Sequence, residues 1–168
     1  MRSFGFAGTC FPITDGIEAA SRNQTQAVRT DTEGVVEKPF MDWAQLGGLV
    51  EAGWEIGAHT ASHGKVAEIY DAAGETGVAR EAEAANTLFD RHLGGAPRHF
   101  AYPSGSRSPA IDAILARYYR SLRRWRFDWP ICWTFTTRST SPLAVDCQNI
   151  DLWVSFEDYC RIFEEATG

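Results

Sequence analysis

The sequence predicts an α/β fold, because short apolar segments alternate along the chain with amphipathic helical ones. Residues 43–53 and 74–92 carry apolar side chains at helical spacing, whereas residues 54–58 and 98–102 are short apolar stretches typical of buried strands. Polar residues follow each of these two strands within two positions, beginning at His59 and at Ser104. Since ligands and catalytic groups collect beyond the C-terminal ends of strands in α/β folds, we expect a functional site at this edge.

Length and composition fit one globular domain over residues 1–168, with 44% apolar residues available for a core. A net charge of −6 and a pI near 5.2 argue against nucleic acid or an anionic membrane as the main partner. No apolar stretch approaches the ~18 residues of a membrane span, and no secretory leader is recognisable. Four scattered cysteines without CxxC spacing disfavour a zinc knuckle and leave the cellular compartment open.

The N-terminal quarter of the chain predicts one strand and one long loop. Residues 4–14 are apolar and β-prone, which favours a buried strand that ends at Asp15 and Gly16. Residues 16–40 are polar with little periodicity, so we expect a loop that contains a short helix.

A well-marked helix and strand lead into a pair of histidines. Asp42 and Gln45 have the spacing of a capping box, and Gly53 stands where a left-handed residue would end the helix. The strand at 54–58 then delivers His59 and His63, which can present two imidazoles to one metal ion. The alternative is that both histidines are structural, hydrogen-bonding groups of their loop.

The second half of the chain continues the alternation. Apolar positions predict a helix over 74–92, ended by two glycines, and a strand over 98–102. Ser108 predicts the cap of a helix that runs through Tyr118, and a further strand is expected at 119–123. After a connecting segment at 146–153, Ser155 predicts the cap of a final helix. The expected inward-facing residues of these helices are Val78, Ala82, Ala85, Leu88, Phe89, Ile111, Ile114, Leu115, Phe156, Tyr159 and Phe163.

Aromatic and apolar side chains occupy every second position between Trp125 and Phe135. This period predicts an extended segment with one aromatic face, and Pro130 restricts it to a sheet edge or an irregular crossing. The face either covers the core or, because aromatic rings stack on sugars, serves as a saccharide platform.

Several motifs, in chain order, resemble one enzyme family. WAQL at residues 43–46 and EAGWEIGAHTASH at residues 51–63 resemble the second motif of the NodB-homology polysaccharide deacetylases, carbohydrate esterase family four. FAYPSG at residues 100–105 resembles the third motif in its F-A-Y-P-x-G variant, and residues 4–14 resemble the family's second strand. The similarity runs in order over about residues 4–165 and implies a distorted (β/α) barrel.

The resemblance also implies roles for individual residues. His59 and His63 correspond to ligands of a catalytic divalent metal, for which zinc is the expected ion. The turn Tyr102-Pro103-Ser104-Gly105 corresponds to a wall of the substrate groove, where a backbone N–H stabilises the oxyanion. Trp129, with the aspartate before it, corresponds loosely to a fourth motif and is a candidate substrate-binding residue. Asp15 is a candidate replacement for the family's missing catalytic-site carboxylate.

Two family motifs have no counterpart in the chain: the first-strand T-F-D-D-G type and the late L-x-H. The metal-binding aspartate, the base aspartate and the acid histidine are therefore absent from their expected positions. We expect a barrel that is truncated at both ends, with little activity, because each missing group is worth roughly two to four powers of ten in rate. Open sheet edges also favour self-association.

Two functions follow from these observations. The first is a metal-dependent hydrolase that removes acetyl groups from a polysaccharide such as peptidoglycan, a chitin-like polymer or a capsular glycan. The alternative is a catalytically inactive relative that binds glycan. The residues do not distinguish N-acetyl from O-acetyl groups, and although the family is often exported, the location of this chain stays open.

Overall fold

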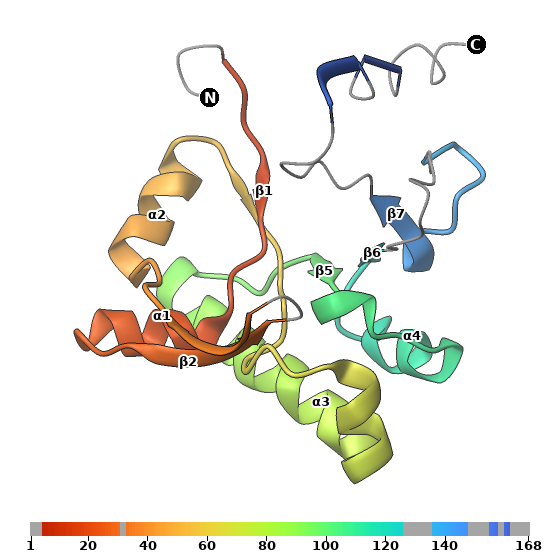
Figure 1. Ribbon diagram of the computed structural model, residues 1–168, viewed down its shortest axis with the longest axis horizontal. Helices are drawn as coiled ribbons and strands as arrows, with labels where there is room; N and C mark the ends of the chain where they lie inside the picture. Colours follow the sequence, from red (N-terminus) through yellow and green to blue (C-terminus); the bar gives the residue numbers. More distant parts are fainter. Residues whose placement is uncertain (1–4, 31–32, 126–135, 148–154, 158–159, 162–168) are drawn as a thin grey trace.

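The computed structural model describes residues 5–30, 33–125, 136–147, 155–157 and 160–161 (Figure 1). Strands and helices alternate through most of this part of the chain, which confirms the predicted α/β class. The elements are β1 (Thr9–Cys10), α1 (Thr14–Ser21), β2 (Gln26–Thr30), β3 (Gly34–Lys38), α2 (Trp43–Glu51), β4 (Glu55–Ile56), α3 (Val66–Leu93), β5 (His99–Ala101), the 3₁₀ turn η2 (Pro103–Gly105), α4 (Pro109–Leu115), β6 (Ser121–Trp125), η3 (Pro142–Ala144) and β7 (Val145–Cys147).

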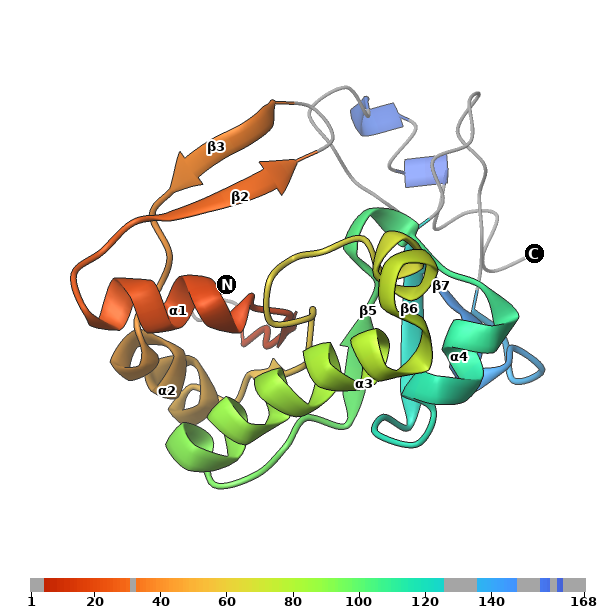
Figure 2. The same ribbon diagram turned by 90° about the horizontal axis from the view of Figure 1, so that it is seen from below.

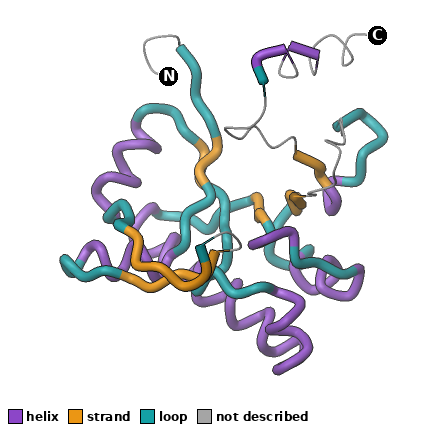
Figure 3. The backbone as a smooth tube through the Cα atoms, viewed as in Figure 1, coloured by secondary structure: helices purple, strands orange, loops and turns teal. Residues whose placement is uncertain are grey.

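The strands form three small groups (Figure 3). β1 pairs in parallel with β4, and β5, β6 and β7 pair in parallel in that order. A parallel bridge between Ala58 and Phe100 joins the two groups just after β4. β2 and β3 form an antiparallel hairpin, which Figure 2 shows as an arm beside α1. The parallel strands do not close into a barrel within the described residues, so the barrel remains a prediction.

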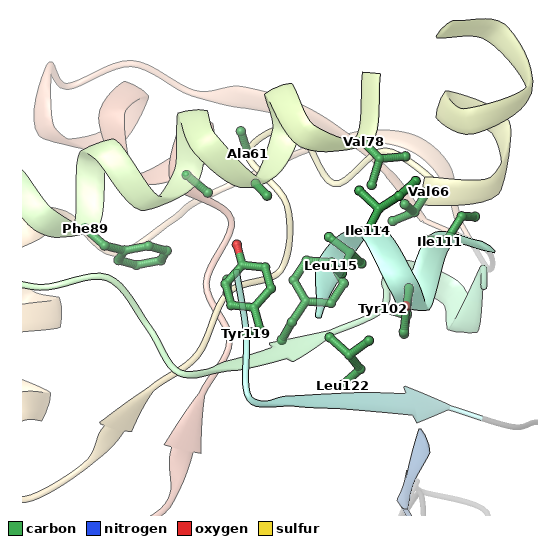
Figure 4. Packing of buried hydrophobic residues seen from close by; sticks show 14 of the residues in the cluster. Ala61, Val66, Val78, Phe89, Tyr102, Ile111, Ile114, Leu115, Tyr119 and Leu122 are labelled. Atoms are coloured by element: carbon green, nitrogen blue, oxygen red, sulfur yellow. The ribbon is translucent and has the colours of Figure 1, made fainter. Parts of the chain in front are cut away.

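The core lies where α3 and α4 cover one face of the parallel strands (Figure 4). Phe100 and Leu122 point from β5 and β6 toward these helices and are 1% and 0% exposed. The predicted inner face of α3 is confirmed, because Val78, Ala82, Ala85 and Phe89 are all buried. Burying each of the larger apolar side chains stabilises the folded state by about 1.5–3 kcal/mol, so this face holds the helix on the sheet.

The helix before the histidine pair has the predicted ends. The Asp42 side chain accepts from the Gln45 N–H, and the Gln45 side chain accepts from the Asp42 N–H, which completes the capping box. Gly53 has φ +85°, a conformation that glycine adopts without strain. Local sequence therefore fixes both ends of the helix, and β4 and the histidine loop follow directly after it.

The N-terminal region differs from the prediction in two ways. The strand is limited to Thr9–Cys10, and Asp15 lies in the first turn of α1 instead of ending a strand. The expected loop contains the β2–β3 hairpin, in which Gly34 has φ +72° next to the turn. Polar residues flank the valines of this hairpin, and they obscured its β character in the sequence.

Smaller differences occur later in the chain. α3 begins at Val66, eight residues before the predicted start, and Gly74 interrupts it with φ 61° and ψ −154°. α4 ends at Leu115 instead of Tyr118, and Val145–Cys147 forms a strand where a connecting segment was expected. Phe156 was placed in a buried stripe but is 80% exposed. Residues 126–135, which carry most of the aromatic alternation, and Tyr159 and Phe163 lie outside the described residues.

Across the part of the chain that the structure describes, none of the helices combines the length and apolar content needed to cross a membrane.

Candidate functional site

Backbone strain gathers in the two loops that follow β4 and β5. Non-glycine residues have positive φ at Thr60 (61°), His63 (63°) and Ser104 (53°), and Asn23 is the other such position in the described chain. Thr60 is β-branched and 1% exposed, and its hydroxyl donates to the His59 carbonyl at 2.6 Å. Such conformations cost about 1–3 kcal/mol each and are found mainly at functional sites, so both loops are candidates on backbone geometry alone.

The two imidazoles of the first loop are held in the same manner. The Nδ1 of His59 lies 2.8 Å from the Ala101 carbonyl oxygen, and the Nδ1 of His63 lies 3.0 Å from that of Arg29. A carbonyl only accepts, so each Nδ1 carries the hydrogen and each Nε2 has a free lone pair. The ring centroids are 5.0 Å apart with a tilt of 51°. Metal-binding histidines characteristically donate their second ring N–H to a carbonyl in this way.

Electrostatics also favour the neutral ligand form of His59. Burial lowers the pKa of this imidazole to about 4, and the hydrogen bond to Ala101 only partly opposes the effect. His59 therefore stays neutral at physiological pH, as a metal ligand must.

A carboxylate on α3 fixes the loop between the histidines. Glu81 accepts the N–H groups of Ala61 and Ser62, both at 3.0 Å, and the Ser62 hydroxyl at 3.1 Å. Charge-assisted hydrogen bonds of this kind are about twice as strong as neutral ones. Glu81 was not identified from the sequence, because it lies 18 residues downstream of His63 on an otherwise ordinary helix.

Asp15 lies beside this loop but does not join the histidines. Its backbone N–H donates to the Ala61 carbonyl at 3.0 Å, which ties the start of α1 to the histidine loop. Burial raises the pKa of the Asp15 carboxyl, and the charges of Glu81 and Glu18 raise it further. Within the described residues no three His, Cys, Asp or Glu side chains group closely enough to hold a metal ion. A third ligand for His59 and His63 is thus not identified in this part of the chain.

The second loop, at η2, carries one unused backbone donor. The N–H groups of Tyr102, Gly105 and Ser106 donate to carbonyls of Arg123, Tyr102 and Pro103, respectively, and Pro103 has no N–H. No hydrogen bond within the described residues engages the N–H of Ser104. The predicted backbone role of this turn therefore has one candidate donor, the Ser104 N–H.

Tyr102, in contrast, has its side chain inside the protein. It is 3% exposed, and its hydroxyl donates to Asp112 Oδ1 at 2.7 Å. Arg107 also pairs with Asp112. Tyr102 therefore supports the turn from inside the protein. Its contact with substrate stays a prediction, as do those of Pro103, Ser104 and Gly105. Trp129 lies outside the described residues.

Comparison with known proteins identifies a family. The sequence profile described as polysaccharide deacetylase matches residues 1–120, while no protein of curated function matches the chain. A de-N-acetylase from Aggregatibacter actinomycetemcomitans has a similar fold, with a TM-score of 0.73 and 13% identity over 96% of this chain and 66% of that structure. A Streptococcus pyogenes deacetylase in complex with acetate gives a TM-score of 0.70 and 16% identity, over 96% of this chain and 60% of that one.

A family 4 carbohydrate esterase from Streptomyces lividans, also in complex with acetate, gives a TM-score of 0.53 and 18% identity. That alignment covers 74% of this chain and 52% of the esterase. At these identities the structures establish the fold, and the chain spans less than two thirds of the length of each. The profile match extends over more than half of the sequence and includes the histidine loop and the η2 turn. The chain therefore belongs to the polysaccharide deacetylase family.

Proposed function

We propose that the chain carries a metal-dependent site for removing acetyl groups from a polysaccharide, built on His59, His63 and the η2 turn. The observation that carries the proposal is the shared anchoring of the two imidazoles, each through Nδ1 to a backbone carbonyl. Both rings are thereby held in the tautomer whose Nε2 can bind a metal. Family membership and the acetate found in two similar structures support an acetyl substrate.

Zinc is the metal we propose, because imidazole ligands suit it and two histidines commonly serve in its catalytic sites. When bound, such an ion lowers the pKa of a water molecule and polarises the acetyl carbonyl. The role of the chain's own residues is to hold both imidazoles with Nε2 available, to keep His59 neutral by burial, and to offer the Ser104 N–H to the oxyanion.

We further propose that the described residues alone support only slow turnover. Neither Asp15 nor another carboxylate forms a three-ligand group with the histidines there, so metal would be held weakly. The same observation favours the second candidate function, a glycan-binding relative without activity. The substrate is either an N-acetylated or an O-acetylated glycan.

Acetate release from a partially acetylated chito-oligosaccharide tests the proposal. We expect slow release that requires added zinc, stops with chelator, and is lost in His63→Ala. Ser104→Ala and Ser104→Gly should retain the rate, because both keep the backbone N–H. Release that ignores chelator would contradict the metal site. Saturable glycan binding without any release would establish the binding function instead.

A further inference from the structure

A second group of polar side chains lies at the opposite edge of the parallel strands. Glu55, His99 and Ser121 are the first residues of β4, β5 and β6, and His99 is the register partner of Ser121. Because these strands are parallel, their first residues lie at the edge away from His59 and the η2 turn. Their neighbours Phe100 and Leu122 point to the helices, so His99 and Ser121 point to the other face of the sheet.

The His99 ring links the three side chains, through a hydrogen bond to Ser121 and an ion-pair contact with Glu55. The Ser121 Oγ lies 2.6 Å from Nδ1 of His99, and Nε2 of the same ring lies 3.2 Å from Oε1 of Glu55. Thr9 donates its hydroxyl to the other carboxylate oxygen of Glu55 at 3.3 Å. A carboxylate accepts but does not donate, so the position of Glu55 beside Nε2 favours the tautomer with hydrogen on Nε2. The Nδ1 lone pair then faces the hydroxyl of Ser121, as a general base for a nucleophile requires.

Glu55, His99 and Ser121 line a cavity of about 430 Å³. Arg123 and Phe11 also line it. This volume suits a small molecule. The side chains of Glu55 and His99 are 52% and 32% exposed, so a substrate can reach them. Arg123 follows Ser121 by two positions on the same strand face and lies 5.7 Å from the centre of the Phe11 ring. A guanidinium here can stabilise a developing oxyanion.

From this geometry we propose that Ser121, His99 and Glu55 form a nucleophilic site that hydrolyses small acyl esters, separate from the histidine pair and independent of metal. Ser121 Oγ bonds to the ester carbonyl carbon while its proton moves to His99 Nδ1. The bond from that carbon to the alcohol oxygen breaks, and the alcohol leaves with the same proton. Water, deprotonated by His99, then attacks the acyl-serine and releases the acid, which restores the Ser121 hydroxyl.

In this proposal Ser121 and His99 are the catalytic residues, and Glu55 is a positioning residue. The contrasting interpretation is a purely structural polar ladder across the strand starts. The two interpretations differ in one property, the reactivity of the serine oxygen. A structural serine has an ordinary hydroxyl that does not react with acyl or phosphonyl reagents at a useful rate.

A fluorophosphonate probe, used with excess chelator, tests this reactivity. In the wild-type chain we expect one adduct, mapped by peptide mass spectrometry to Ser121, and chelator-resistant hydrolysis of p-nitrophenyl acetate. Ser121→Ala should abolish the adduct, and His99→Ala should slow its formation by at least about 100-fold. Ser139→Ala, a change at an exposed serine, should have no effect.

Glu55→Gln should slow labelling at least about tenfold, and Glu55→Asp should recover part of that rate, whereas a structural role would change only the unfolding midpoint. The mapping on the wild-type chain gives a result even if a variant fails to fold. Absence of an adduct at Ser121, or labelling that persists unchanged in folded His99→Ala, would overturn the proposal. Because chelator is present throughout, failure here leaves the zinc-dependent acetate release to be judged on its own experiment.

Discussion

The imidazoles of His59 and His63 lie with their centroids 5.0 Å apart, and carbonyls from two separate parts of the chain hold them there. Ala101 belongs to β5, and Arg29 belongs to the β2–β3 hairpin. The pair is therefore preorganised by tertiary contacts, with both Nε2 atoms left to bind a ligand.

Zinc titration by calorimetry measures whether the two imidazoles bind a metal ion and how tightly. We expect His59→Ala and His63→Ala each to weaken zinc binding by at least about tenfold, because each removes a proposed ligand. His92→Ala is the matched control, since His92 stacks on Trp43 at 4.3 Å and lies away from the pair. Equal affinities in wild type and His59→Ala would contradict the metal site and favour structural histidines.

The titration of His59 predicts how the metal-free protein responds to acid. Its pKa is about 4 in the folded chain against 6.5 ordinarily, so between these values the unfolded chain binds the extra proton. The contribution of neutral His59 to the free energy of unfolding is therefore complete above about pH 6.5. It declines as the pH falls toward 4, by at most about 3 kcal/mol. Urea denaturation in chelator across this range should show the slope, which His59→Ala should reduce. A profile identical in the variant would rule out this origin.

Local sequence was sufficient to predict some elements and insufficient for others. The capping box at Asp42, the glycine at position 53 and the buried stripe of α3 act within a few residues, and the structure has all three. The hairpin and the early start of α3 depend on packing against other segments of the chain. Neither the hydrophobic periodicity nor the secondary-structure propensity of the residues reveals such packing.

The same distinction applies to the site. The histidine pair and the η2 turn were visible as motifs, because their spacing is local. Glu81 and the Arg29 carbonyl were not, since each reaches the loop from another element and a backbone carbonyl has no sequence signature. The positive φ of Thr60 was not predictable from the sequence either, because threonine is an unfavourable residue for that conformation.

Glu81→Gln tests whether the carboxylate holds the histidine loop. The amide retains one acceptor oxygen but loses the charge, so we expect a loss of about 1–2 kcal/mol in unfolding free energy. Zinc affinity should fall with it, because the loop carries both proposed ligands. Glu83→Gln on the same helix is the control, since the Glu83 carboxylate accepts only from the Tyr118 hydroxyl among the described hydrogen bonds. Equal effects of the two changes would contradict the assignment.

Tyr102→Phe separates the packing of this ring from its hydroxyl. The ring stays buried against Phe100, with centroids 5.2 Å apart, while Asp112 keeps its pairing with Arg107. We expect a loss of about 1.5–3 kcal/mol in unfolding free energy by urea denaturation, because the acceptor of this hydrogen bond is a carboxylate. Acetate release should be unchanged, because the hydroxyl faces the interior. A loss of activity without a loss of stability would show that Tyr102 contacts substrate after all.

Asp15→Asn distinguishes a structural carboxylate from a metal ligand. Burial, Glu81 and Glu18 raise the pKa of Asp15, so its ionised form is less favourable in the folded chain than in the unfolded one. Asparagine should therefore stabilise the protein at pH 7, and the gain should shrink as the pH falls through the raised pKa and the carboxyl becomes protonated. Denaturation at several pH values measures this. Zinc titration of the same variant supplies the second readout. A stabilised protein with unchanged zinc affinity would exclude Asp15 as the missing ligand, whereas a fall of tenfold or more would mean that metal binding draws Asp15 toward the histidine pair.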